Sequence, residues 1–312
     1  MLTLEERLMI GLKVLEKLRP RLRALHPQGE GPLSGEISPE GASSENTFPL
    51  EVSSLAAGDL IEGVVEDAPS EHLFEVPTLD WILEQVGSLS PYSLVLGLCD
   101  DGLPFVLDLT NPAPGALLIT GEAGSGKTRL LKAILASVIR INAPDQVPFS
   151  VIATQPDEYL SLAEADHCQQ LNAINESEIN DLIHELAGVV EERRKGGSQG
   201  PVYLLAIDDL ASLVQSIDEL TYARLYWLIR HGPRSRVWTI ATLSTERAAE
   251  LDVRFLEAFR TRLLGFMTDA DLAIRLSGDS NFNMDDLRYG SEFCVPYGQD
   301  WLRFSICEPE GS

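Results

Sequence analysis

The run of eight residues from 121 to 128, Gly-Glu-Ala-Gly-Ser-Gly-Lys-Thr, constrains the fold more than any other part of the chain. It fits the pattern G-x-x-x-x-G-K-[ST] at every fixed position. An apolar run, Ala116–Thr120, precedes it directly, and apolar residues at helical spacing follow it. This order of strand, glycine-rich loop and helix is that of a P-loop, so the sequence predicts an α/β nucleotide-binding domain.

The backbone of such a loop can hold the phosphates of a nucleotide. Glycines let the chain curl until successive N–H groups point at phosphate oxygens, and the following helix adds the positive end of its dipole. Lys127 is expected to reach the β- and γ-phosphates, and the hydroxyl of Thr128 to coordinate magnesium. We therefore expect ATP and Mg²⁺ as ligands, with the nucleotide held by Gly121, Glu122, Ala123, Gly124, Ser125, Gly126, Lys127, Thr128 and Arg129.

A second acidic motif follows about 80 residues later. The apolar run Tyr203–Ile207 ends in Asp208 and Asp209, which is the arrangement of a Walker B strand. Asp208 would then orient the magnesium shell, and Asp209 would polarise the attacking water as the catalytic acid. The alternative is an ordinary strand end with two solvated acids.

Arginines are concentrated between residues 224 and 262 of an otherwise acidic chain. In ring ATPases, an arginine of one subunit can reach the γ-phosphate bound by the next subunit. Arg230 and Arg234 are the first candidates for this catalytic role and Arg236 is a third, because the segment 230–236 joins a predicted helix to a predicted strand. A solvated basic loop, or salt bridges to the neighbouring acids, would explain the same arginines without any catalytic role.

Strands and helices alternate from residue 91 onwards, which predicts a mainly parallel sheet. The predicted strands are Ala116–Thr120, Phe149–Thr154, Tyr203–Ile207, Val237–Thr242 and Arg262–Met267. The predicted helices are Lys127–Ile141, Glu178–Arg194 and Glu219–His231, with a further short helix, Leu79–Val86, opened by Thr78.

The chain before residue 91 divides into three parts. Residues 1–26 are expected to form an amphipathic helix, with leucines every three or four residues from position 4 to position 25. Residues 27–53 are rich in Pro, Gly, Ser and Glu, which is typical of a flexible linker. Residues 54–90 form a small lead-in region, and residues 91–312 form the ATPase domain. The helix over residues 3–26 either packs on its own domain or docks onto a partner protein.

Composition narrows the remaining function classes. The formal net charge of −24 disfavours a broad nucleic-acid-coating role, although a narrow basic pore stays compatible with it. No apolar run reaches the ~18–20 residues that span a bilayer. The four cysteines form neither a CxxC pair nor a metal-ligand set with histidine. We therefore expect a cytoplasmic protein with no membrane segment.

Beyond the loop, the chain resembles the FtsK/HerA clade of motor ATPases, and most of all the FtsK motor domain. The segment 94–109, LVLGLCDDGLPFVLDL, is similar to the lead-in "LGxDxxGxPxxxDL" of that family, with Cys99 at its first Asp position. Weaker matches follow in the family's order. They are PDQVPF at 144–149, VEERR at 190–194, TIAT at 239–242 and TR at 261–262.

This resemblance implies a RecA-like core, a hexameric ring with nucleotide between subunits, and double-stranded DNA as the translocated polymer. Two positions depart from the family pattern. Asp209 stands where the family has Glu, and Leu243 stands where it has a glutamine that senses the γ-phosphate. A carboxylate one methylene shorter is expected to fall about 1.5 Å short of the catalytic water, and a misplacement of ~1 Å can cost ~10²-fold in rate. Hydrolysis is therefore expected to be slow or dependent on a partner.

Three functions follow from these observations. The first is a ring-forming ATPase that translocates DNA, supported by the intact P-loop. The second is a degenerate nucleotide-binding switch or scaffold subunit of a larger complex, supported by Asp209 and Leu243. The third is a secretion-type ATPase that handles protein, which suits the acidic charge better than DNA does.

Overall fold

The computed structural model describes residues 77–197, 200–278, 287–297 and 300–308. The predicted helix over residues 1–26, the predicted linker over 27–53 and most of the lead-in region lie outside these ranges. In the described part, the helices are α3 Leu79–Val86, α4 Lys127–Ile141, α5 Leu160–Ala163, α6 Glu178–Arg194, α7 Leu210–Ser216, α8 Glu219–His231, α9 Val253–Ala258 and α10 Ala270–Ser277. The strands are β1 Ser93–Cys99, β2 Pro104–Asp108, β3 Leu117–Gly121, β4 Phe149–Ala153, β5 Cys168–Ala173, β6 Tyr203–Asp208, β7 Val237–Ser244, β8 Thr261–Gly265, β9 Glu292–Tyr297 and β10 Asp300–Ser305.

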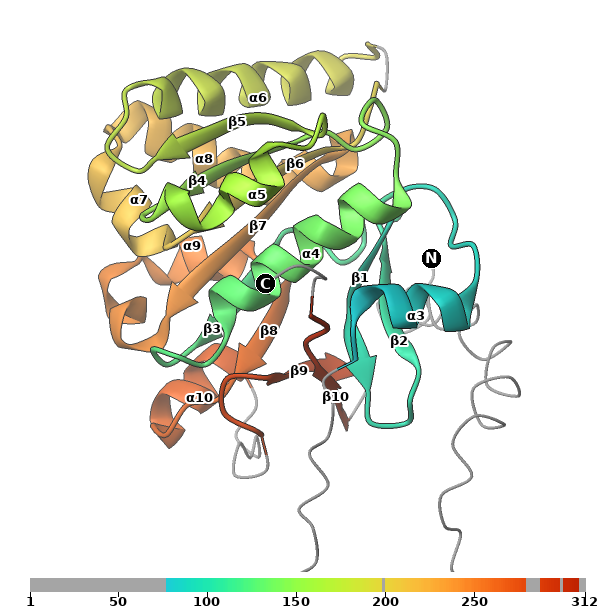
Figure 1. Cartoon of the computed structure of the whole chain (residues 1–312). Coiled ribbons are helices and arrows are strands. Elements are labelled where there is room, and N and C mark those ends of the chain that lie inside the picture. The colour runs from blue at the N-terminus through green and yellow to red at the C-terminus, as the bar shows by residue number, and fades with distance from the viewer. Residues whose placement is uncertain (1–76, 198–199, 279–286, 298–299, 309–312) are drawn as a thin grey trace, which may run out of the picture. The chain divides into compact units, whose positions relative to one another are not determined.

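These strands form a single mixed sheet in the order β2-β1-β10-β9-β8-β3-β7-β6-β4-β5 (Figure 1). The run from β8 to β5 is parallel, and the strands from β2 to β9 pair antiparallel. The predicted fold class, a RecA-like α/β domain built around parallel strands, is confirmed.

Helices cover both faces of the sheet, which therefore separates two apolar cores. Leu117 and Ile119 of β3 face the core shared with α3 and α4, whereas Leu118 faces the core shared with α6 to α10. All three side chains are fully buried. A strand buried on both faces reads as a continuous apolar run, which is why it was recognisable in the sequence.

Capping residues set the helix boundaries where the sequence placed them. Thr78 accepts a hydrogen bond from the N–H of Trp81 at the start of α3, and Asp218 accepts one from Thr221 at the start of α8. The four predicted helices have the predicted bounds. The strands differ by one or two residues at their ends, which is the usual uncertainty at element boundaries. None of the helices in the described ranges is long and apolar enough to cross a bilayer.

The parallel strands β3, β6 and β7 determine where the site lies. They are neighbours in the sheet and run in the same direction, so their carboxyl ends meet at one edge. The P-loop follows β3, Asp208 ends β6, and Thr242 lies near the end of β7. Crevices outside the carboxyl ends of parallel strands are where α/β sheets bind their ligands.

Candidate nucleotide-binding site

The P-loop connects β3 to α4 through two left-handed glycines. Gly124 has φ +77° and Gly126 has φ +91°, a region that L side chains rarely adopt. Gly126 is also the N-cap of α4, where no side chain accepts a hydrogen bond from the first turn. The N–H groups and the helix dipole at this end are suited to an anion, and phosphate binding here stays a prediction.

Lys127 starts α4, and its ammonium folds back onto the loop. Nζ donates to the backbone oxygens of Gly121, at 2.9 Å, and of Glu122, at 2.6 Å. Burial lowers the pKa of Lys127, while the carboxylates of Glu246 and Asp208 act in the opposite sense. Neutral backbone oxygens therefore hold the ammonium at the loop. Because it has no carboxylate partner among these two contacts, the ammonium can transfer to a phosphate.

The structure brings the two predicted magnesium residues together across 80 residues of sequence. The hydroxyl of Thr128 lies 3.2 Å and 3.1 Å from the two carboxylate oxygens of Asp208. Two further hydroxyls donate to this carboxylate: Tyr159 at 2.9 Å and Thr242 at 2.6 Å. Neither Tyr159 nor Thr242 is predicted to contact Asp208, because both are distant in sequence, although Thr242 belongs to the family-like segment TIAT at 239–242.

This donor set fits magnesium. Mg²⁺ prefers hard oxygen ligands and is usually bound by one or two protein groups together with waters and substrate phosphates. Within the described ranges no group of three or more His, Cys, Asp or Glu side chains could form a metal cage. Thr128 and Asp208 would therefore hold the ion with the nucleotide, rather than bind it alone.

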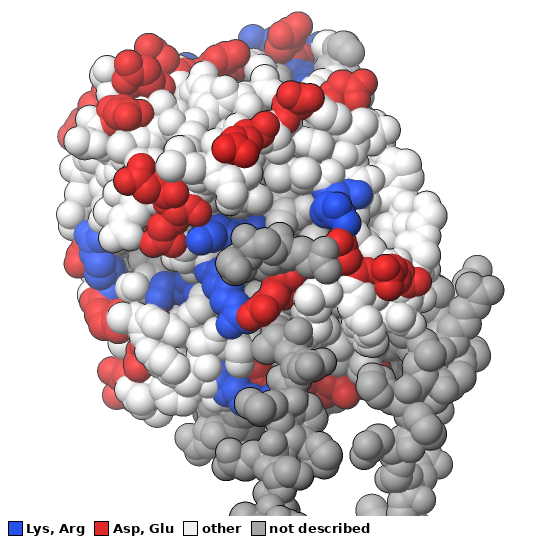
Figure 2. Space-filling model, in the orientation of Figure 1, with Lys and Arg blue, Asp and Glu red and all other residues white. Residues whose placement is uncertain are grey.

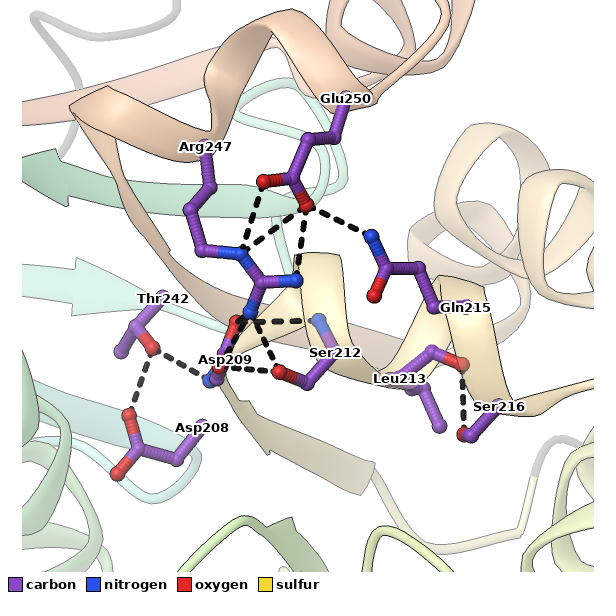
Figure 3. Close-up of polar contacts among 9 residues, drawn as sticks. All are labelled: Asp208, Asp209, Ser212, Leu213, Gln215, Ser216, Thr242, Arg247 and Glu250. Carbon is purple, nitrogen blue, oxygen red and sulfur yellow. Dashed lines mark hydrogen bonds and ion pairs between the residues drawn. The ribbon is translucent and has the colours of Figure 1, made fainter.

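Asp209 turns away from this pair. Its φ of +77° is left-handed, and its carboxylate caps α7 by accepting from the N–H and the hydroxyl of Ser212 (Figure 3). Its own N–H donates to Thr242, at 2.8 Å. Thr242 thus joins the backbone of one acid to the carboxylate of the other.

Arg247 completes the surroundings of Asp209. Its Nη1 lies 3.0 Å and 2.8 Å from the two oxygens of Asp209, and its Nε and Nη2 bond Glu250 (Figure 3). Arg247 lies on η3, the short 3-10 helix Thr245–Glu250 that follows β7. The predicted role of Asp209 toward water stays a prediction. In the structure its carboxylate is occupied by a helix cap and an ion pair.

Leu243 lies fully buried near the end of β7, beside Thr120 of β3. It packs in the core shared with α6 to α10. The position at which the resembled family has a phosphate-sensing glutamine is therefore an apolar core position here.

Arg230 and Arg234 lie at the opposite end of the sheet from the P-loop. Arg230 is near the end of α8 and Arg234 is in the 3-10 turn η2, Gly232–Ser235, just before β7 begins. The eight residues of β7 separate them from the site by roughly 25 Å. Both side chains are exposed, and neither can reach the P-loop of its own chain. Their predicted role in another subunit stays a prediction.

Residues from elsewhere in the chain surround the loop and were not assigned to the site from the sequence. The carboxylate of Glu246 accepts from the N–H of Ala123 at 3.2 Å, and the hydroxyl of Tyr289 donates to the oxygen of Ala123 at 2.7 Å. The carboxylate of Glu122 accepts from the hydroxyl of Thr268 at 2.6 Å. No local pattern could have revealed these contacts, because each joins segments more than 120 residues apart.

A cavity of about 500 Å³ opens beside the loop. It is lined by Gly124, Gly126, Lys127, Thr128, Arg129, Lys132, Glu158 and Glu308. Arg129 pairs with Glu308 at 2.8 Å, and Lys132 pairs with Glu158 at 3.5 Å. Figure 2 shows Lys and Arg gathered near the middle of this face, with patches of Asp and Glu around them on a mostly uncharged surface. The face is thus suited to an anion.

Parts of the chain are similar to known ATPases. Residues 105–240 match the AAA ATPase domain family. The ESX-5 secretion system protein EccC5 of Mycobacterium marinum is 24% identical over 221 residues, and that of Mycobacterium tuberculosis strain H37Rv is 23% identical over 223 residues. Each match covers 61% of this chain but only 16% of the relative.

Solved structures show the same fold at low sequence identity. EssC (ATPases 2 and 3) from Geobacillus thermodenitrificans aligns with a TM-score of 0.60 at 16% identity, covering 72% of this chain and 46% of that one. EccC (ATPases 2 and 3) of Thermomonospora curvata, in complex with a signal sequence peptide, gives 0.58 at 18%, covering 76% and 43%. The pCW3 conjugation coupling protein TcpA with ATPgS gives 0.57 at 17%, covering 75% and 69%.

Proposed function

We propose that this chain binds ATP with Mg²⁺ and hydrolyses it slowly, as a subunit of a FtsK/HerA-like ATPase of the secretion type. The observation that carries the proposal is the contact of Thr128 with Asp208. It joins the start of α4 to the end of β6, so that two oxygen donors of the kind that Mg²⁺ prefers lie together at the carboxyl edge of the sheet.

Each group of the site has a defined part in binding. The N–H groups at the start of α4 take the phosphates, and the ammonium of Lys127 moves from the oxygens of Gly121 and Glu122 to the phosphate charge. Thr128 and Asp208 hold the ion, which when bound would neutralise charge on the phosphates. Tyr159 and Thr242 keep the carboxylate of Asp208 in its orientation.

Slow turnover follows from the surroundings of Asp209. Its carboxylate is saturated by Ser212 and Arg247, so it must leave both before it can polarise water. A partner that rearranges η3 would release it. This supports hydrolysis that depends on assembly, which is common to ring-forming ATPases whose sites are completed by a neighbour.

Protein is the substrate class that we favour over double-stranded DNA. The net charge of −24 repels a polyanion, and the similar chains include proteins of secretion systems. TcpA, a conjugation coupling protein, keeps DNA handling as the alternative. A hexameric ring, a partner for residues 3–26 and a cytoplasmic site of action belong to the same proposal; one of the similar structures is the cytoplasmic domain of a secretion ATPase.

A nucleotide-binding switch or scaffold subunit is the second candidate. The buried Leu243 and the occupied Asp209 favour it, because neither can act on a γ-phosphate as placed. In that case ATP would be bound and not consumed.

Nucleotide binding and turnover of purified protein separate these functions. We expect Mg²⁺-dependent ATP binding that Lys127→Ala abolishes, with slow turnover that double-stranded DNA does not raise. ATP bound without turnover above the Lys127→Ala blank would support the switch, and stimulation by DNA would support the DNA motor. Equal ATP affinity in wild type and Lys127→Ala would overturn the site itself.

A further inference from the structure

One carboxylate at the phosphate loop has no part in the function proposed so far. Glu246 lies on η3, directly before Arg247, and its side chain accepts a hydrogen bond from the N–H of Ala123. Ala123 is an exposed residue of the loop, and the backbone N–H groups of such loops are donors for phosphate oxygens. The Glu246 carboxylate thus accepts from a loop N–H that an anionic ligand of the loop would also use.

The charge environment of Lys127 locates Glu246 at the same end of the site. Burial lowers the pKa of Lys127, and among the carboxylates that raise this pKa Glu246 comes first, ahead of Asp208 and Asp209. A P-loop lysine reaches the β- and γ-phosphates, and the helix N-terminus holds the phosphates nearer the nucleoside. Glu246 therefore competes for the part of the loop that the terminal phosphate uses.

We propose that Glu246 is an internal competitor of the terminal phosphate of ATP, so that the loop accepts this phosphate only when the Glu246 side chain leaves the N–H of Ala123. This inference rests on the proposed ATP site and adds a residue that sets its affinity and its preference between ATP and ADP. Two negative groups cannot share one N–H donor and one ammonium without repulsion. Glu246 is exposed, so it can swing into solvent without disturbing the core.

The test is ATP and ADP affinity of the full chain carrying Glu246→Gln, measured by calorimetry in the presence of Mg²⁺. Removing the negative charge should raise ATP affinity about 10- to 100-fold, the range expected for one hydrogen bond to a charged group. ADP affinity should change much less, because ADP lacks the phosphate that meets Glu246.

Glu158→Gln is the matched control. It removes the same charge near the loop, where Glu158 lines the cavity and pairs with Lys132. Its effect on ATP affinity should be at most a few-fold, because exposed charges are screened by solvent and salt. Equal gains in ATP affinity in the two variants would show that the overall negative charge near the loop causes the effect, and this would overturn the proposal.

Loss of ATP affinity, or no change, in Glu246→Gln would also overturn it. Failure of the ATP site is distinguishable from this outcome, because wild type, Glu246→Gln and Lys127→Ala would then all fail to bind ATP. Thermal unfolding of each variant, expected within a few degrees of wild type for an exposed side chain, confirms that affinity is compared between folded proteins.

Discussion

Arg247 and Asp209, 38 residues apart in the chain, form a two-point ion pair in which Nη1 lies 3.0 Å and 2.8 Å from the two carboxylate oxygens. About 27% and 31% of the two side chains is exposed, so the pair is neither fully solvated nor fully buried. The pair holds Asp209, the acid that follows β6, at the start of α7.

Arg247→Met should remove one of the two partners that hold Asp209, Ser212 being the other, and so raise ATP turnover relative to wild type. It should also lower the free energy of unfolding by about 1 kcal/mol, since half-exposed pairs contribute modestly. Steady-state hydrolysis and urea unfolding measure the two effects. Arg254→Met is the control, because Arg254 pairs with Asp252 at the surface with 81% of its side chain exposed. A fall in turnover in a folded Arg247→Met protein would show that the arginine assists the reaction.

Thr242→Val should destabilise the protein by about 1–3 kcal/mol, because the Asp208 carboxylate and the N–H of Asp209 both lose their hydroxyl partner. It should also weaken Mg²⁺-dependent ATP binding. Thr239→Val, three residues earlier on β7, is the matched variant. The Thr239 hydroxyl is buried without a hydrogen-bond partner, so valine there should be neutral or stabilising. Urea unfolding measures the free energy of unfolding of both variants. Equal losses of stability in the two would contradict the bridging role of Thr242.

Gly126→Ala should abolish nucleotide binding and destabilise the fold by more than about 1 kcal/mol. Gly126 has φ +91°, and a Cβ would lie 2.6 Å from the backbone oxygen of Gly290. Gly188→Ala provides the opposite expectation, since Gly188 is an exposed position within α6 with nothing near its Cβ. Alanine there should stabilise by about 0.5–1 kcal/mol. A stable, ATP-binding Gly126→Ala protein would refute the loop geometry.

The buried thiols should respond to alkaline pH and resist alkylation. Burial raises the pKa of Cys99 and Cys294 to about 12 and that of Cys307 to about 11. These values exceed the ~8.5 of an unfolded cysteine, so the folded state retains protons that the unfolded state loses. Stability is therefore complete below pH ~8.5 and falls as pH rises toward 11–12.

Urea unfolding at pH 8 and pH 10 tests this sign. Iodoacetamide labelling at pH 8, read by mass spectrometry, should modify the half-exposed Cys168 first, although burial also raises the pKa of that thiol. Labelling of Cys294 as fast as Cys168 in the folded protein would contradict the burial.

The elements that could be predicted are those fixed by local chemistry. Apolar periodicity predicted the bounds of α4, α6 and α8, and the loop motif predicted the turn between β3 and α4 that carries Lys127. Thr128 and Asp208 were both expected to serve one magnesium ion, and they meet because β3 and β6 are parallel strands on either side of β7. The setting of Asp209 could not be predicted, because a left-handed backbone turns its side chain and its partner Arg247 comes from another strand end. Domain boundaries before residue 77 remain predictions.

Glu246 and Arg247 are consecutive residues on one short turn, yet one touches the phosphate loop and the other the acid at the end of β6. The two contacts therefore depend on the position of one short 3-10 turn. A change in the length or position of this turn would therefore displace both contacts together, even with the phosphate loop and the acidic strand end intact in sequence.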